Sequence, residues 1–151
     1  MLFYTHLLLG VFFFLLVDPF LSPARELVFF LMVLLGSVFP DIDEPHSKMN
    51  RWSGILGRVV GVLFIHRGVI HSFLFMGLMC ALVWHFWAGF AALGLLLGYV
   101  AHLFGDALTP MGVAVLYPFS NFRVRGPIRT GGLVEVLLMV LIIVLVVRKT
   151  I

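Results

Sequence analysis

Aspartate and histidine side chains stand in four short clusters of a chain that is otherwise almost entirely apolar. Hydrophobic residues make up 62% of its 151 residues and charged residues 11%, and the mean hydropathy is +1.16. An ionisable group inside a bilayer costs roughly 2.5–3.5 kcal/mol, so such groups are seldom kept there without a function. Aspartate and histidine are also ligands of zinc and similar divalent metals. We therefore expect a site for one or two divalent ions, zinc or another metal, with the ligands His6, Asp41, His71, His102 and Asp106.

His102 and Asp106 form the strongest pair because they stand four residues apart in an apolar run. Residues with this spacing share one face of a helix and can bind the same ion. The alternative is a buried structural pair that only stabilises the helix. The absence of charge from Gly68 to Gly105 favours the metal site, since an isolated polar pair in such a stretch needs a reason.

Asp41 and Asp43 flank a single isoleucine directly after Pro40. In extended backbone, alternate side chains point the same way, so we expect the two carboxylates to converge. Carboxylates held that close repel each other unless a cation or a shared proton lies between them. We expect Asp41 to be a ligand and Asp43 to be a general base. The alternative is a solvated loop with helix-capping acids, the role that we expect for Glu44.

His66 and His71 are five residues apart, which is about 140° on an ideal helix, so both cannot face one point there. Gly68 lies between them and is expected to break the helical geometry. His71 is expected to begin the next helix and to be a ligand, and His66 is expected to be a catalytic residue. Arg67 is planar and permanently charged, so it could neutralise an anionic substrate group. Its alternative role is to mark the cytoplasmic side of the membrane.

The remaining histidines and the cysteine carry weaker signals. His6 has only Thr5 as a polar neighbour, and a single histidine in an apolar helix is usually a buried packing residue. Its expected position beside the other ligands favours a role in the metal site instead. His46 is expected to be a solvated loop residue and His85 an interfacial one. Cys80 is the single cysteine, which excludes an internal disulfide and a cysteine-rich zinc site.

The apolar segments predict an all-α fold, a polytopic membrane bundle of about five short transmembrane helices in one domain over residues 1–151. We interpret the first segment as a retained helix rather than a signal peptide, because no Lys or Arg precedes it. Asp18, Pro19, Ser22 and Pro23 are expected to form the following turn. Residues 55–65 are expected to lie on the membrane or to re-enter it rather than to span it. The expected spans are residues 3–17, 27–39, two helices within 68–105 separated near Trp84–Gly89, and 133–147.

Five crossings would place most basic residues on one face. Lys48, Arg51, Arg58, Arg67, Arg123, Arg125 and Arg129 would lie on the face of the N-terminus, against Arg25, Arg148 and Lys149 on the other. The positive-inside rule then predicts an integral cell membrane protein whose site faces the cytoplasm and whose C-terminus is outside. Because the basic residues are scattered among loops, no nucleic-acid partner is expected.

The order of these motifs resembles the YdjM-like (DUF457) family of membrane-bound metal-dependent hydrolases. At a greater distance, the order of histidines and aspartates is similar to that of zinc-dependent phospholipase C and related nucleases, which implies phosphodiester chemistry. The residues that carry the family resemblance are Thr5 and His6, Pro40 to Asp43 with Ser47, His66 to Ser72, Gly98 to Asp106, Thr109, Gly112 and Leu116 to Pro118.

The residues and the resemblance together predict a membrane-embedded metal-dependent hydrolase. Its expected substrate is a phosphoester of a phospholipid or of a lipid-linked molecule, because helix ends at the bilayer boundary meet lipid head groups. Arg67 or one of Arg123, Arg125 and Arg129 would bind the phosphate. The alternative is a non-catalytic, metal-stabilised scaffold or regulator that binds a soluble partner. A transporter is less favoured because the ligands gather at one face.

Overall fold

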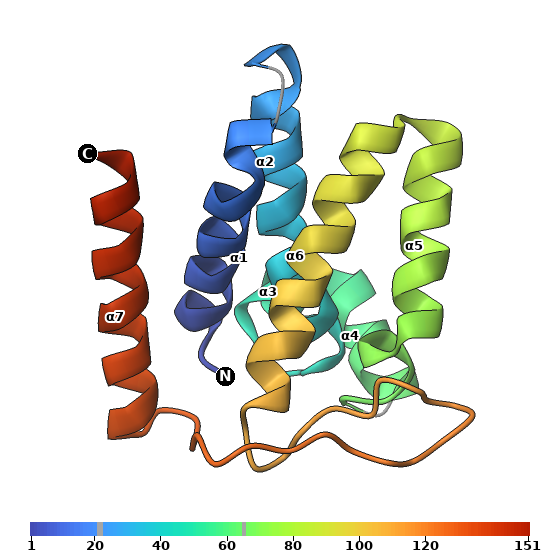
Figure 1. The fold of residues 1–151 in the computed structure, drawn as a ribbon. Helices are drawn as coiled ribbons and strands as arrows, with labels where there is room; N and C mark the ends of the chain where they lie inside the picture. Colours follow the sequence, from blue (N-terminus) through green and yellow to red (C-terminus); the bar gives the residue numbers. More distant parts are fainter. Residues whose placement is uncertain (21–22, 65) are drawn as a thin grey trace.

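Every regular element of the chain is a helix within the residues that the computed structural model describes, which are 1–20, 23–64 and 66–151 (Figure 1). The one β-type pairing in these residues is an isolated bridge between Val113 and Val124. The expected all-α class is therefore confirmed.

Five longer helices run along a common direction, and two short ones lie across one end of the bundle (Figure 1). The long helices are α1 (Phe3–Val17), α2 (Pro23–Val38), α5 (Phe73–Phe86), α6 (Gly89–Ala107) and α7 (Leu133–Thr150). The short helices are α3 (Lys48–Trp52) and α4 (Gly54–Leu63). Three 3-10 turns complete the helical elements: η1 (Asp18–Phe20), η2 (Phe39–Asp43) and η3 (Val69–His71).

The polar connections gather at the end of the bundle that holds the N-terminus. There α3, α4 and the long segment that joins α6 to α7 lie together, whereas the C-terminus lies at the opposite end (Figure 1). The expected grouping of the polar segments at one end is present in the structure.

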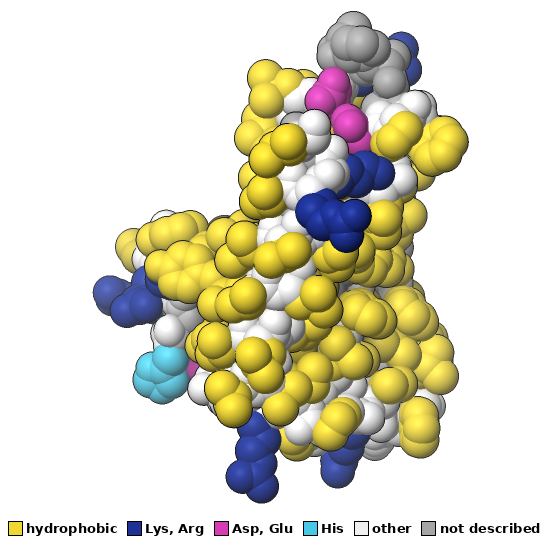
Figure 2. Space-filling model, turned by 60° about the vertical axis from the view of Figure 1, so that its left-hand side comes forward, with side chains coloured by type: hydrophobic (Ala, Val, Ile, Leu, Met, Phe, Trp, Pro, Cys, Tyr) yellow, Lys and Arg dark blue, Asp and Glu magenta, His cyan; other side chains and the backbone are white. Residues whose placement is uncertain are grey.

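Among the described residues, two segments are long and apolar enough to cross a bilayer by length and composition, Phe3–Phe20 and Gly89–Ala107. Helix α5 has 14 residues, or about 21 Å at 1.5 Å per residue, against a hydrocarbon core of about 30 Å. The prediction of five spans is therefore not confirmed. The face shown in Figure 2 is nevertheless mainly hydrophobic, with charged side chains above a broad apolar area and along its lower edge.

The predicted boundaries hold closely for α1 and less well for α2. Residues 3–17 are helical as expected, but α2 begins at Pro23 rather than at Leu27. Proline suits the first position of a helix because its missing N–H would have no partner there. Pro23 was expected in the preceding turn but is helical, so this part of the prediction is wrong. Ser22 lies outside the described residues. The break near Trp84–Gly89 is confirmed, since α5 ends at Phe86 and α6 begins at Gly89.

Glycines let α2 and α6 approach closely, and this contact positions the site. A Cβ atom added at Gly98 would lie 2.0 Å from the Val33 carbonyl oxygen, and one added at Gly36 would lie 2.4 Å from the Leu95 carbonyl oxygen. Small residues at helix contacts are typical of membrane proteins, where packing replaces the hydrophobic effect between helices. The next turn of α6 carries His102 against the end of α2.

Candidate metal centre

The five expected ligands come from four elements, and all lie at the end of the bundle that holds the N-terminus. They are His6 of α1, Asp41 of η2, His71 of η3, and His102 and Asp106 of α6. The side chain of Asp41 is 14% exposed, and those of the other four are 0–1% exposed. The structure therefore brings together residues up to 100 positions apart in the sequence.

Three of these side chains direct ligand atoms at one another from three sides. His71 Nε2 lies 3.2 Å from His102 Nε2, and Asp106 Oδ2 lies 3.5 Å from His71 Nε2 and 3.7 Å from His102 Nε2. Two ligand atoms that are each about 2.1 Å from a tetrahedral zinc ion are about 3.4 Å apart. Asp106 Oδ2 is buried and has no hydrogen-bond partner. The spacing and the missing partner both fit a divalent ion held between the three atoms.

The far side of each imidazole is supported in the way that metal ligands usually are. His102 Nδ1 lies 2.8 Å from the Ser37 carbonyl oxygen, so this nitrogen donates and Nε2 keeps its lone pair for the site. His71 Nδ1 lies 3.3 Å from Asp43 Oδ2, within ion-pair distance but without a hydrogen bond. An outer partner such as the Ser37 carbonyl fixes the tautomer and orientation of a ligating histidine. Sequence reasoning did not identify Ser37, because it contributes its backbone carbonyl and not its side chain.

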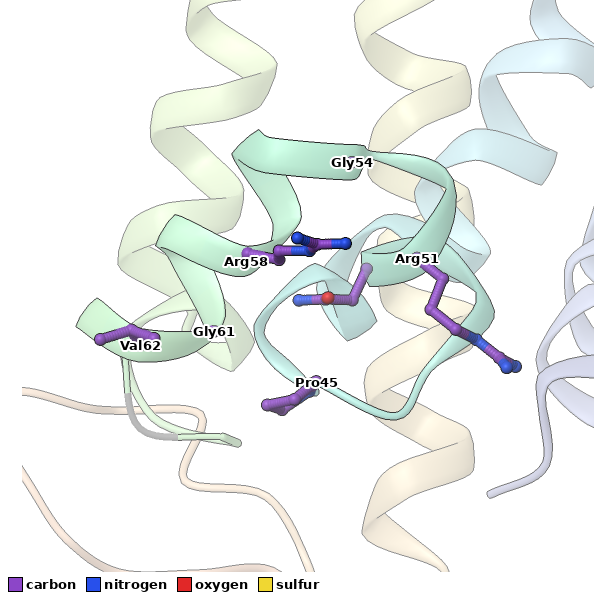
Figure 3. A pocket seen from close by; sticks show the side chains of 7 residues that line it. Pro45, Arg51, Gly54, Arg58, Gly61 and Val62 are labelled. Atoms are coloured by element: carbon purple, nitrogen blue, oxygen red, sulfur yellow. The ribbon is translucent and has the colours of Figure 1, made fainter.

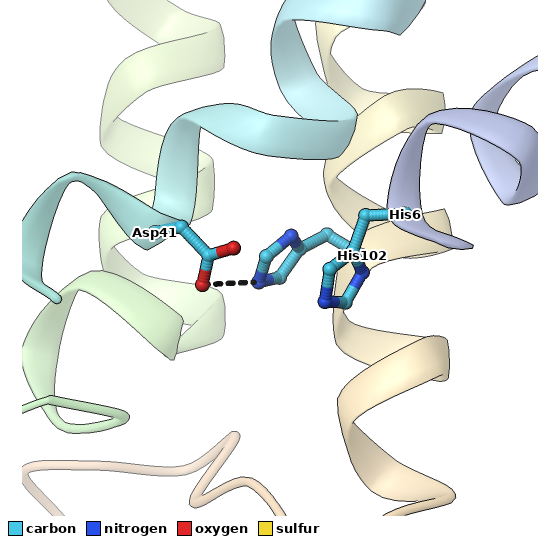
Figure 4. Close-up of side chains that lie close together, drawn as sticks. All are labelled: His6, Asp41 and His102. Atoms are coloured by element: carbon cyan, nitrogen blue, oxygen red, sulfur yellow. Dashed lines mark ion pairs between the residues drawn. The ribbon is translucent and has the colours of Figure 1, made fainter. Parts of the chain in front are cut away.

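His6 and Asp41 border the same cluster on opposite sides of His102 (Figure 4). Asp41 Oδ1 lies 3.7 Å from His102 Nε2, and the His6 ring stacks on the His102 ring at a centroid distance of 3.9 Å. Within the described residues neither ring nitrogen of His6 makes a hydrogen bond, although the side chain is fully buried; its Nε2 lies 3.5 Å from Asp106 Oδ1. A buried polar atom without a partner is costly, so His6 and Asp41 fit a fourth ligand or a second ion.

Asp41 and Asp43 do not lie on extended backbone, so this part of the prediction is wrong. They lie in the 3-10 turn η2, where Pro40 fits the first turn, and their side chains serve different partners. Asp43 Oδ1 accepts from His66 Nδ1 at 2.8 Å, while Asp41 faces His102. Burial alone would raise the pKa of Asp43, but the imidazoles of His66 and His71 outweigh it and hold that pKa below its ordinary value.

One ring nitrogen of His66 is bound to Asp43, and the His66 side chain is 20% exposed. Burial lowers the pKa of His66, but the adjacent Asp43 carboxylate outweighs this and raises it above the ordinary value. His71 lies in η3 and does not begin α5, as the sequence had suggested, because Ser72 caps that helix. Glu44 is the C-cap residue of η2, while Ser47 caps the start of α3, and the Glu44 carboxylate lies 3.5 Å from His66 Nε2.

Arg67 is buried beside the cluster in a left-handed backbone conformation, with φ of 60°. Its guanidinium donates to Asp106 Oδ1 at 2.7 Å, to Thr109 Oγ1 at 2.7 Å and to the Gly112 carbonyl oxygen at 3.1 Å. Arg67 therefore fixes the carboxylate whose other oxygen faces the histidines. Non-glycine residues in this conformation are strained and gather at functional sites. Whether Arg67 also binds substrate stays a prediction.

Sequence reasoning also missed Glu135, the single acid of α7. This buried side chain accepts hydrogen bonds from the Leu2 amide at 2.7 Å and the Gly131 amide at 2.6 Å. It thereby ties α7 to the start of α1, about one turn from His6. The sequence did carry a signal for Glu135, because an ionisable residue within an apolar helix usually has a function.

A cleft of about 480 Å³ opens beside the cluster. Asp41, His66 and Arg67 are among its lining residues, together with Lys48, Met111 and Thr130. Ligand sites commonly have volumes of about 300–1,000 Å³. The three expected arginines of the long loop do not line this cleft, whereas Lys48, which the sequence reading did not select, does.

Comparisons with known proteins identify a membrane family. A family model described as YdjM inner membrane protein matches residues 1–151. The uncharacterized protein YvsG of Bacillus subtilis (strain 168) is 36% identical over 125 residues, which is 81% of this chain and 73% of that protein. Inner membrane protein YdjM of Escherichia coli (strain K12) is 34% identical over 101 residues, 63% of this chain and 51% of that protein, so the match spans about half of its length. No solved structure matches the chain.

Proposed function

Because the chain belongs to the YdjM inner membrane protein family, we propose that it is a membrane-embedded, zinc-dependent hydrolase of a phospholipid or lipid-linked phosphoester. One observation carries this proposal. His71 Nε2, His102 Nε2 and Asp106 Oδ2 face one another at 3.2–3.7 Å, and Asp41, 3.7 Å from His102 Nε2, lines the neighbouring cleft. Catalytic zinc sites typically have three protein ligands and keep one position open.

The donors suit zinc, because two imidazoles and a carboxylate match its usual ligands. His71, His102 and Asp106 would hold the ion, and Asp41 would border its open side. A bound zinc ion supplies a Lewis acid and makes water a nucleophile near neutral pH.

The surrounding side chains supply the remaining groups that hydrolysis needs. His66 lines the cleft, and its Nδ1 is held by Asp43, so its Nε2 can take or give a proton. This arrangement makes His66 the proton-transfer residue and Asp43 the group that orients it. Lys48 offers a positive charge in the cleft for the substrate phosphate. Arg67 holds Asp106 in place and borders the same cleft.

A lipid substrate fits the position of the cleft. The cleft opens at one end of a bundle whose apolar helices α1 and α6 are long enough to lie among acyl chains. An amphiphile in the bilayer would present its phosphate at this level, while its chains stay beside the apolar helices. A soluble phosphoester has no acyl chains that could contact the adjacent apolar helices.

Hydrolysis should be measured with a panel of phospholipids and isoprenoid phosphates in liposomes that contain the zinc-loaded protein. We expect chelator-sensitive turnover, and His66→Gln should lower it by about 10²–10⁴-fold while zinc stays bound, because proton transfer and not ligation is lost. His85→Gln is the matched control, since His85 is on α5 at the other end, and it should keep full activity. A wild type that binds zinc but cleaves no lipid phosphoester would end the hydrolase proposal.

A non-catalytic, metal-stabilised scaffold is the second candidate. Asp41 Oδ1 lies 3.7 Å from His102 Nε2, close enough for a protein carboxylate to fill the fourth position of a zinc ion. Structural zinc sites are closed in this way. In that case Asp41→Ala would release the metal, whereas the hydrolase proposal expects it to stay bound.

We further propose that the chain crosses the membrane five times, with the metal centre at the cytoplasmic face and the C-terminus outside. Seven Lys and Arg residues on the side of the centre, against three on the other, support this orientation. Local thinning of the bilayer or borrowed flanking residues would let the shorter helices α2 and α5 span.

Cysteine labelling tests this orientation in a Cys80→Ser background. A membrane-impermeant maleimide added to intact cells should label Ile151→Cys, which is fully exposed, and should label His46→Cys only after the cells are opened. Labelling of both positions in intact cells, or of neither, would contradict the five-span arrangement.

A further inference from the structure

A second cleft lies between α3 and α4, apart from the metal centre, and its charged side chains are basic. It has a volume of about 610 Å³, and Asn50, Arg51, Gly54 and Arg58 are among its lining residues. Figure 3 shows Arg58 extending over the hollow, whereas the Arg51 side chain starts at its rim and points away from it. No Asp or Glu of the described residues lines the cleft.

Both arginines are available to a ligand. Arg51 and Arg58 are exposed, and within the described residues neither guanidinium has a hydrogen bond or an ion pair. Two exposed, unpaired guanidinium groups on neighbouring short helices are suited to a phosphate, because each offers a planar pair of N–H donors.

The helix that carries Arg58 also exposes a continuous apolar face. On α4, Ile55 is 81% exposed, Val59 48% and Val62 86%, and their spacing of four and three residues puts them on one side of the helix. The opposite side packs inward through Gly57, where a Cβ atom would lie 2.2 Å from the Asn50 carbonyl oxygen. An exposed apolar face bordered by a basic residue is typical of helices that lie in a membrane interface.

We propose that the cleft between α3 and α4 binds the phosphate of an anionic phospholipid, with Arg51 and Arg58 as its partners and α4 lying in the interface. The charge of the cleft selects an anion, and the apolar face beside it selects an anion that carries acyl chains. A free phosphate would satisfy the arginines but would leave Ile55, Val59 and Val62 in water.

The two sites share a structural element, although neither requires the other to function. Asn50, which lines the cleft, donates to the Ile42 carbonyl oxygen at 2.7 Å and to the Gly57 carbonyl oxygen at 2.6 Å. Ile42 lies between Asp41 and Asp43 in η2. The bound lipid would therefore support the turn that carries two residues of the metal centre, but its binding needs no metal and no turnover.

Fluorescence of Trp52 measures this binding directly. Trp52 ends α3 next to Arg51 and is 70% exposed. Trp84→Phe and Trp87→Phe leave it as the single tryptophan. The protein would be placed in phosphatidylcholine vesicles that contain a small fraction of brominated phosphatidylglycerol or, for comparison, of brominated phosphatidylcholine.

We expect phosphatidylglycerol to be the stronger quencher, and Arg51→Gln with Arg58→Gln to remove the preference. Each basic residue near an anionic lipid surface contributes about fivefold to binding, which is about 1 kcal/mol. Arg51→Lys with Arg58→Lys should keep most of the preference. Arg148→Gln with Lys149→Gln removes the same charge from the opposite end and should leave it unchanged.

Three results would overturn the proposal. They are equal quenching by both brominated lipids in the parent protein, an unchanged preference in the folded double glutamine variant, and loss of the preference when millimolar glycerol phosphate is added. The last would indicate a site for free phosphate. Helical content by circular dichroism confirms that each variant is folded, and none of these outcomes depends on hydrolysis.

Discussion

Gly98→Ala should destabilise the protein and weaken its metal site at the same time. The added Cβ would lie 2.0 Å from the Val33 carbonyl oxygen and 2.8 Å from the Ser37 amide nitrogen, so α2 and α6 must separate. Overpacking of this kind typically costs about 1–3 kcal/mol. Because His102 stands one turn further along α6 and its Nδ1 bonds to the Ser37 carbonyl, the separation should also loosen a zinc ligand. Thermal unfolding in detergent, together with zinc affinity, measures both effects.

Gly77→Ala is the matched control for this substitution. Gly77 lies within α5, and a Cβ atom there would meet nothing within 4 Å. Alanine favours a helix over glycine by up to about 1 kcal/mol, so this variant should be as stable as the parent or more so. Equal melting temperatures and zinc affinities for Gly98→Ala and the parent would show that the close helix contact does not position the centre.

The grouping of the site residues could be predicted from the sequence because it follows from helix direction alone. Helices that alternate up and down place His6, Asp41, His71 and the end of α6 at one level, and the structure confirms this arrangement. His102 and Asp106 face the same cluster, as their spacing of four residues predicted.

The parts that were wrong or missed depend on tertiary contacts that no local pattern reveals. Asp41 and Asp43 were expected on extended backbone, but a 3-10 turn gives them different partners. Ser37 acts through a backbone carbonyl, so its side chain gave no signal. The contacts of Arg67 with Asp106 and Thr109, which follow it by 39 and 42 positions, were missed, while its expected role toward an anionic substrate group stays a prediction.

The loss of a single ligand should release the metal. His102→Ala removes an imidazole without leaving an unpaired charge, and it should lower zinc affinity by more than about 100-fold, since the loss of an outer partner alone costs 10–100-fold. His85→Ala, at the other end of the bundle, should bind zinc as the parent does. Lipid hydrolysis should fall together with zinc occupancy in the first variant and persist in the second.

X-ray absorption at the zinc edge, measured on the purified protein loaded with one equivalent of zinc, tests whether His71, His102 and Asp106 hold the ion. We expect a shell of nitrogen and oxygen ligands at about 2.0–2.1 Å with the outer scattering of at least two imidazoles. We also expect the imidazole signal to fall in His102→Ala. A shell that contains sulfur at about 2.3 Å, or a spectrum that is identical in the parent and in His102→Ala, would contradict a metal centre built on His71, His102 and Asp106.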